Sequence, residues 1–141
     1  MNILKVLTER RILGNFGERA ARRYLKRNGY RILEKNFITD AGEIDIIARK
    51  GDITAIVEVK TRTVGSNFGI ESRPSSSVTP EKQRRLISAA KIYRTRYHID
   101  SKIRFDIIEV YTESTLSGNR VSEIKHLKGA FDLNTSRNLR R

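Results

Sequence analysis

Apolar positions recur at helical spacing in two segments of the chain. Between residues 15 and 27 they form one stripe, which predicts a helix with Asn15 as its N-cap. A similar stripe predicts a second helix over 80–97, where Thr79 is a suitable cap and Pro80 occupies the first helical position. Both segments therefore have one face that needs to pack against another element.

Alternating β-branched and polar residues, bounded by Gly, Asn and Asp, predict five strands. They cover residues 30–37, the two arms of a hairpin between 42 and 62 with its turn at 50–52, and then 103–112 and 120–127. The element order α-β-β-β-α-β-β predicts an α/β fold in which a mixed β-sheet is flanked by α-helices.

The length of 141 residues suits one domain, which we expect to span residues 1–131. The Gly- and Ser-rich segment 63–77 is predicted to be a long loop that follows the hairpin and either closes over the substrate or runs along it. Residues 132–141 are basic and polar, and we expect a disordered tail.

The charge is lopsided, with 29 Lys and Arg against 16 Asp and Glu and a formal net charge of +13. Such an excess attracts polyanions, and nucleic acid is the commonest of these. A membrane surface is the competing interpretation, but Trp is absent and no helix carries a broad apolar face. With no secretory signal or 18-residue apolar run, we expect a cytoplasmic protein that does not bind membranes.

Cysteine is absent and there are only two histidines, which excludes disulfides and sulfur-based zinc sites and disfavours a Ser-His-Asp triad. Any chemistry must come from carboxylates, lysines and a hard metal ion. Strict alternation along the first hairpin strand puts Glu43, Asp45 and Ile47 on one face and Ile44, Ile46 and Ala48 on the other. On the second strand Glu58 and Lys60 share a face, so the hairpin brings Asp45, Glu58 and Lys60 together.

This group suits phosphodiester hydrolysis. The Asp45 and Glu58 carboxylates are the hard oxygen ligands that Mg²⁺ or Mn²⁺ prefers. Lys60 would orient or deprotonate the attacking water, or stabilise charge in the transition state. The alternatives are a cross-strand ion pair between Asp45 and Lys60, and an ordinary surface role for Glu58.

Asp45 followed by Glu58-Val59-Lys60 resembles the PD-(D/E)xK signature of restriction-endonuclease-like nucleases, with Ile44 in place of the usual proline. More closely, the chain resembles the YraN family of small bacterial proteins predicted to be nucleases. The matching residues include Gly17-Glu18, Gly29-Tyr30, Asn36, Gly42-Glu43-Ile44-Asp45, Val57-Glu58-Val59-Lys60, Arg62, Val78, Lys82, Arg104-Phe105-Asp106 and Gly129-Ala130-Phe131. The resemblance implies a restriction-endonuclease-like sheet similar to that of archaeal Holliday-junction resolvases.

The resemblance also implies that a glutamate of the first helix completes the metal site, and Glu18 occupies the matching position. The alternative is that Glu18 is simply an acid favoured by the dipole of a first helical turn. Arg62 and Lys82 are candidates for phosphate contact in nucleic acid. For Lys82 the alternative is a lysine that extends from a helix start into solvent.

These residues together predict a Mg²⁺- or Mn²⁺-dependent endonuclease that hydrolyses phosphodiester bonds in DNA, such as repair or recombination intermediates. The alternative is a non-catalytic nucleic-acid-binding adaptor that retains the nuclease fold, and an RNA substrate would use the same chemistry. Cleavage of a four-way junction would require a homodimer to position two sites, and no sequence feature settles dimerisation.

Overall fold

The computed structural model describes residues 2–64 and 78–132, and its elements follow the predicted order. They are α1 (Ile3–Arg27), β1 (Arg31–Ile38), β2 (Glu43–Lys50), β3 (Ile53–Thr63), α2 (Pro80–Tyr97), β4 (Lys102–Thr115) and β5 (Gly118–Phe131). The α/β class, the mixed sheet and the element order are thus confirmed. The predicted loop over residues 63–77 begins too early, because Thr63 still belongs to β3. Residues 65–77 of that loop and residues 133–141 of the predicted tail over 132–141 lie outside the described residues.

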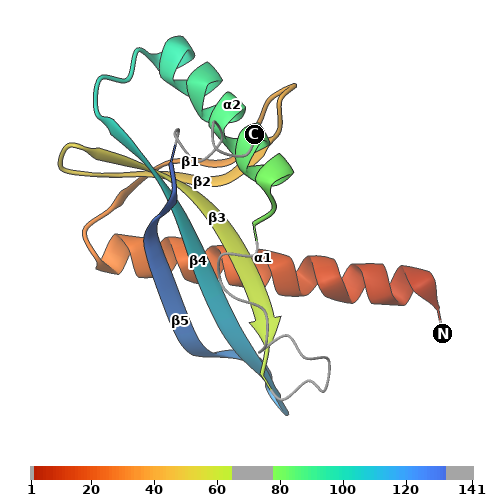
Figure 1. Cartoon of the computed structure of the whole chain (residues 1–141). Coiled ribbons are helices and arrows are strands. Elements are labelled where there is room, and N and C mark those ends of the chain that lie inside the picture. Colours follow the sequence, from red (N-terminus) through yellow and green to blue (C-terminus); the bar gives the residue numbers. More distant parts are fainter. Residues whose placement is uncertain (1, 65–77, 133–141) are drawn as a thin grey trace.

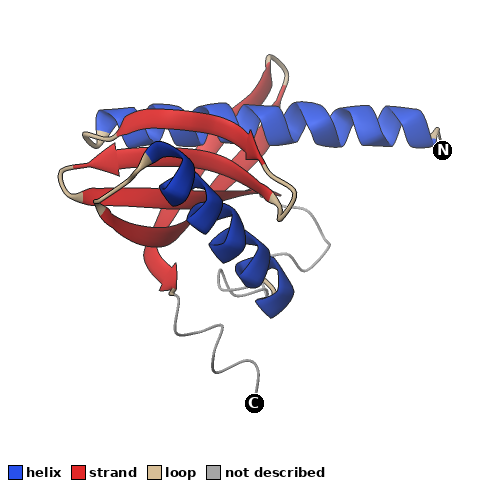
Figure 2. Cartoon of the chain, turned by 90° about the horizontal axis from the view of Figure 1, so that it is seen from above, coloured by secondary structure: helices blue, strands red, loops and turns tan. Residues whose placement is uncertain are grey.

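The five strands form one sheet in the order β1-β2-β3-β4-β5. Neighbouring strands are antiparallel except for β3 and β4, which are parallel and enclose α2 in the chain between them. Helix α1 lies across one face of the sheet and α2 lies on the opposite face (Figures 1 and 2). The molecule therefore has three layers, with the sheet in the middle.

Each face of the sheet carries its own apolar cluster. On the α2 side the cluster includes Ile44, Ile47, Ile56, Leu86, Ala90, Tyr93, Phe105 and Ile107. On the α1 side it includes Ala21, Leu25, Ile46, Ala48, Ala55, Val57, Ile108 and Val110. Strands β2, β3 and β4 supply both clusters, so the middle of the sheet is buried on its two faces.

Helix α1 begins at Ile3, twelve residues before the predicted start, so the prediction of Asn15 as N-cap is wrong. The Asn2 side chain caps the helix by accepting a hydrogen bond of 3.0 Å from the backbone N–H of Leu4. The additional turns project beyond the sheet (Figure 1) and expose apolar side chains, including Leu4 at 69%. The apolar pattern did not predict these turns, because their apolar residues do not pack against the sheet and so do not continue the buried stripe.

The predicted hairpin is confirmed, with its turn at Gly51 and Asp52. Strands β4 and β5 are longer than predicted because their polar outer ends continue to pair with each other as far as Thr115 and Gly118. Neither helix of the described residues combines the length and apolar character needed to cross a membrane.

Candidate active site

Strands β2 and β3 separate at the position of the predicted site. Their pairing runs from the hairpin turn to Ile46 opposite Val57 and goes no further. Beyond that point the Asp45 Oδ2 atom accepts a hydrogen bond of 2.9 Å from the backbone N–H of Val59. We call this place the β2–β3 fork, defined by Asp45 on one strand and by Glu58 and Val59 on the other. The Asp45 carboxylate therefore lies between the two strands rather than on one face of a regular sheet.

The side chains of β2 change faces at the fork. Ile44 packs in the same cluster as Ile47, on the α2 side, whereas Ile46 packs on the α1 side. The prediction that Ile44 and Ile46 share a face is therefore wrong. Opposite the fork, Asn36 of β1 adopts a left-handed conformation with φ of 51°, which interrupts the regular alternation there. Because of this irregularity, Asp45 is directed toward β3 and away from either core.

Glu58 of β3 is buried and only half satisfied. Its Oε1 atom lies 2.8 Å from the Nζ atom of Lys82, which reaches it from the first turn of α2, and the Glu58 side chain is 5% exposed. Its Oε2 atom is buried and has no hydrogen-bond partner among the described residues. A buried carboxylate oxygen without a partner is costly in free energy. The fork thus contains an oxygen that a cation or a bound donor would stabilise.

Several carboxylates share the fork, and their charges act on one another. Burial, followed by the charge of Glu58 and more weakly that of Glu18, raises the pKa of Asp45 to about 7 despite the bond from Val59. Burial and the charges of Glu43 and Glu58 likewise raise the pKa of Glu18, against the opposing effect of Arg22. Mutual repulsion of this kind is relieved by a proton or a cation.

A hard divalent cation suits this donor set. Asp45 and Glu58 offer carboxylate oxygens, one of them unpartnered, and Glu18 lies within electrostatic range on α1. As they stand, however, the described residues contain no group of three or more Asp, Glu, His or Cys side chains arranged to hold an ion. The Oε1 atom of Glu58 is instead occupied by the ammonium of Lys82. The donor atoms of the fork thus suit a metal ion, but one of them is paired with the lysine ammonium.

Lys60 follows Glu58 by two residues on β3 and is half-buried. Within residues 2–64 and 78–132, its ammonium makes no ion pair or hydrogen bond, so the alternative of a cross-strand pair with Asp45 is wrong. Lys60 is therefore a cation beside the fork whose charge is not already neutralised by a side chain of the described part.

Arg62 is differently placed. Its Nε atom donates a hydrogen bond of 2.8 Å to the Oε2 atom of Glu109 on β4, and both side chains are largely buried, at 10% and 2% exposed. This pair joins two parallel strands of the sheet. The role of Arg62 in phosphate contact stays a prediction that its present partner does not favour.

Helix α1 brings Glu18 to the fork through a close crossing with β3. Any Cβ atom on Gly17 would collide with Thr61 Oγ1, so only glycine permits this approach. Because α1 begins at Ile3, Glu18 lies in the middle of the helix, and the alternative that a first-turn dipole explains it is wrong. Glu18 also lines a pocket of about 290 Å³ between α1 and β3, together with Arg10 and Thr61.

Sequence patterns missed two features of the site. The contact between Glu58 and Lys82 joins residues that are far apart in the chain, and no spacing rule connects them. Glu43 was expected to share the face of Asp45. Its charge raises the pKa values of both Glu18 and Lys82, which lie on the two helices on opposite sides of the sheet. Its position two residues before Asp45, at the start of β2, was the available signal.

Comparison with known proteins identifies relatives along most of the chain. The model of the family described as "Uncharacterised protein family UPF0102" matches residues 17–110. The chain belongs to this family, which is the YraN family expected from the sequence. UPF0102 proteins of Clostridium perfringens and Geobacter metallireducens are 44% and 43% identical to it over 120 and 122 residues, covering 84% and 86% of the chain and 93% of each relative. One of Flavobacterium psychrophilum is 41% identical over 125 residues, 89% of the chain and 98% of the relative.

The matched region begins at Gly17 and contains the whole fork, including Glu18, Asp45, Glu58 and Lys82. The projecting turns of α1 before Gly17 lie outside the matched region. The matched region thus covers the candidate site and the sheet from β1 as far as Val110 in β4, and the relatives align over longer stretches of 120–125 residues.

Proposed function

We propose that this UPF0102 protein is a metal-dependent nuclease that hydrolyses phosphodiester bonds in nucleic acid, with DNA as the expected substrate. The observation that carries the proposal is the buried Glu58 carboxylate beside Asp45 in the fork, because its Oε2 atom has no hydrogen-bond partner among the described residues. Two carboxylates and a nearby lysine whose charge is not neutralised by the described residues form a chemical set suited to phosphoryl transfer. The proposed nuclease fold is of the restriction-endonuclease type.

Asp45 and Glu58 would hold Mg²⁺ or Mn²⁺, with Glu18 supporting the site directly or through water. When bound, such an ion polarises a phosphate oxygen and lowers the pKa of a coordinated water. The Val59 N–H keeps the Asp45 carboxylate oriented toward the fork. Lys60 would orient the attacking water or stabilise the charge that develops on the phosphate.

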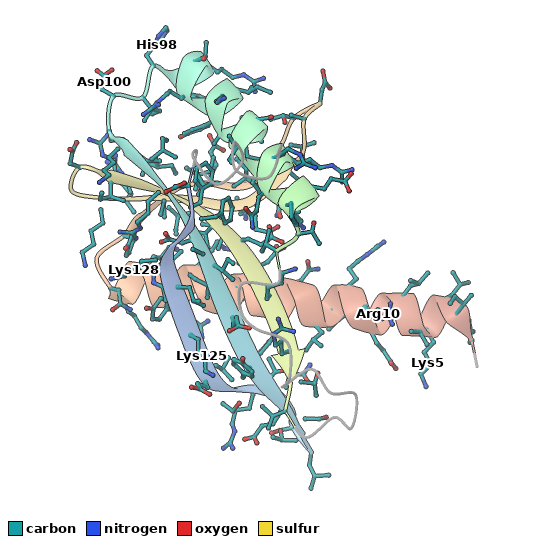
Figure 3. The ribbon with its side chains drawn as sticks, in the orientation of Figure 1. Lys5, Arg10, His98, Asp100, Lys125 and Lys128 are labelled. Atoms are coloured by element: carbon teal, nitrogen blue, oxygen red, sulfur yellow. The ribbon has the colours of Figure 1, made fainter. Side chains whose placement is uncertain are left out.

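The charge distribution supports a polyanionic substrate. The net charge is +13, and basic side chains project from both α1 and β5, where Figure 3 labels Lys5, Arg10, Lys125 and Lys128. Such a surface raises the local concentration of nucleic acid and speeds its capture.

A nucleic-acid-binding adaptor without catalysis is the second candidate. The ion pair between Lys82 and Glu58 favours it, because it already compensates one carboxylate of the fork without any metal. An adaptor would need the basic surface but neither Asp45 nor Lys60.

Cleavage assays separate the two functions. Labelled single strands, duplex, flap, four-way junction and structured RNA are incubated with the full chain in EDTA, Mg²⁺ or Mn²⁺. We expect metal-dependent cutting that Asp45→Ala and Lys60→Ala each reduce by at least about 100-fold. Matched controls are Asp100→Ala and Lys91→Ala, which remove an exposed acid and an exposed lysine remote from the fork and should cut normally.

Absence of cutting on every substrate, with nucleic-acid binding intact in all four variants, would contradict the nuclease and favour the adaptor. Cutting that survives both Asp45→Ala and Lys60→Ala would place the catalytic site elsewhere.

A further inference from the structure

Lys82 occupies the position in the fork where positive charge is needed. Its Nζ atom lies 2.8 Å from Glu58 Oε1, and its side chain is 45% exposed while that of Glu58 is 5% exposed. Although burial opposes it, the hydrogen bond and charge of Glu58, with the charges of Asp45 and Glu43, raise the pKa of Lys82. The Lys82 ammonium therefore interacts with three carboxylates, two of them on β2 and one on β3.

The same ammonium conflicts with a second cation at the fork. Glu58 has one oxygen paired with Lys82 and one oxygen without a partner. A divalent ion shared by Asp45 and Glu58 would lie close to Lys82, and like charges at such distances repel. Lys82 has a route away, because its half-exposed, flexible side chain can turn into solvent without burying its charge.

We propose that Lys82 is a resident counter-ion of the β2–β3 fork, which balances Asp45 and Glu58 in the absence of metal and leaves Glu58 when a divalent cation binds. The released ammonium then lies at the rim of the fork and is free to contact a phosphate of the substrate. This exchange rests on the proposed function only in requiring that the fork binds a divalent cation.

Mn²⁺ binding to the full chain, measured by calorimetry without nucleic acid, tests this exchange. Lys82→Met keeps an unbranched apolar stem and removes the charge, and Lys91→Met makes the same change at an exposed lysine on the same helix. Since Lys82 competes with the ion, we expect Lys82→Met to bind Mn²⁺ at least about fivefold more tightly than the unmodified chain, and Lys91→Met to bind like it. Detectable Mn²⁺ binding by Lys82→Met, with none by the unmodified chain or Lys91→Met, would also support the exchange.

A second readout needs no substitution in the site. In the unmodified chain labelled with ¹³C at lysine Cε, the Lys82 signal should shift on addition of Mg²⁺, and the Lys91 signal should stay in place. Equal Mn²⁺ affinity of the unmodified chain and Lys82→Met, with a stationary Lys82 signal, would overturn the exchange but leave the proposed nuclease standing. Weaker binding by a folded Lys82→Met would also overturn it. No Mn²⁺ uptake by any of these proteins would overturn both the exchange and the metal-dependent function.

Discussion

At the scale of single residues, the fork holds acidic groups in an environment that disfavours their charge. Among the described residues, the Asp45 carboxylate accepts a hydrogen bond from the Val59 N–H, whereas burial and the neighbouring Glu58 and Glu18 carboxylates disfavour its charge. A stable sheet would be better served by apolar residues here. The free-energy cost of burying these carboxyl groups is consistent with a role in binding or catalysis, because carboxyl groups with strongly shifted pKa values are concentrated at functional sites.

The raised pKa of Asp45 predicts how the free energy of unfolding depends on pH. The folded pKa of about 7 exceeds the ordinary value of 3.8, so the folded state binds more protons than the unfolded chain between these values. Stability should therefore fall as pH rises through this window. Asp45→Asn keeps an acceptor for Val59 without the charge, and we expect it to be more stable than the unmodified chain by about 1–2 kcal/mol near pH 8 and not near pH 4.

Urea unfolding across this pH range measures the effect without added metal. The control is Asp100→Asn, at an exposed carboxyl between α2 and β4 (Figure 3), which should follow the unmodified chain at each pH. A variant at Asp45 that loses stability at high pH would mean that the ionised carboxylate is well compensated in the fold.

At the scale of elements, the crossing of α1 over β3 decides where Glu18 lies. The helix packs through Gly17, Ala21 and Leu25, and its closest approach to the sheet is at Gly17 against Thr61. Sequence patterns indicated a helix with an apolar stripe, but they did not indicate which turn would touch the strand or how far the helix would continue before it.

Two glycines on α1 form a matched pair that tests the crossing. A methyl group on Gly17 meets Thr61 Oγ1, whereas one on Gly14 meets nothing within 4 Å. We expect Gly17→Ala to lower the free energy of unfolding by about 1–3 kcal/mol, because the helix must move away from β3. Gly14→Ala should raise it by about 0.5–1 kcal/mol, since alanine is the better helix former.

Urea unfolding of both variants measures these changes, and Mn²⁺ binding reports whether the shift of α1 also withdraws Glu18 from the fork. Similar stabilities for the two variants would show that α1 does not approach β3 as closely as described.

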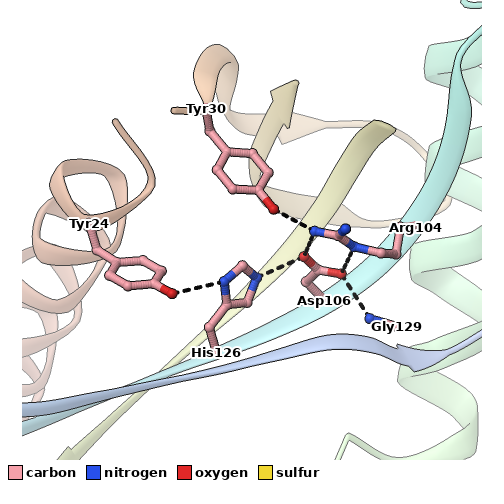
Figure 4. A network of polar contacts seen from close by, with 6 residues as sticks. All are labelled: Tyr24, Tyr30, Arg104, Asp106, His126 and Gly129. Atoms are coloured by element: carbon pink, nitrogen blue, oxygen red, sulfur yellow. Dashed lines mark hydrogen bonds and ion pairs between the residues drawn. The ribbon is translucent and has the colours of Figure 1, made fainter. Parts of the chain in front are cut away.

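At the scale of the whole molecule, a buried polar network joins elements that are distant in sequence (Figure 4). The Asp106 carboxylate of β4 receives a bidentate pair of hydrogen bonds from Arg104, each 2.8 Å, and another of 3.0 Å from the Gly129 N–H. His126 of β5 lies 2.8 Å from Asp106 through Nε2 and 3.1 Å from the Tyr24 hydroxyl of α1 through Nδ1. The network therefore connects α1, β4 and β5 on the side of the sheet opposite α2.

The network predicts a second, opposite dependence on pH. Although burial opposes it, hydrogen bonds from His126, Arg104 and Gly129 lower the pKa of Asp106 below 3.8. A lowered carboxyl pKa contributes stability above the unfolded value and loses it as pH falls through the folded one. We expect Asp106→Asn to cost about 2–4 kcal/mol near pH 7, since it leaves buried donors without their charged partner, and less below about pH 4.

Thermal or urea unfolding at the two pH values checks this. Glu81→Gln is the control, because it weakens an exposed ion pair in which the Arg85 and Glu81 side chains are 63% and 67% exposed. It should change stability by less than about 0.5 kcal/mol. A loss of similar size in both variants would contradict the structural role of the network.

Local patterns in the amino-acid sequence were enough to predict the order of the elements, the α/β class and the residue types available for chemistry. Hairpin turns, caps and apolar periodicity are local, so the order α-β-β-β-α-β-β, the cap at Thr79 and the proximity of Asp45 to Glu58 could be predicted from neighbours in the chain. The resemblance to the YraN family pointed to Glu18 as well, without a geometry for it.

How these residues meet depended on contacts between elements that are distant in the chain. The faces of β2 depended on an irregularity shared with Asn36 of the adjoining strand, and the partner of Glu58 depended on where α2 packs. Likewise Arg62 was committed to Glu109 by the parallel pairing of β3 with β4, and His126 to Asp106 by the pairing of β4 with β5. Contacts of this kind arise from long-range packing, whose free energy is spread over many residues and leaves no periodic pattern in any one segment.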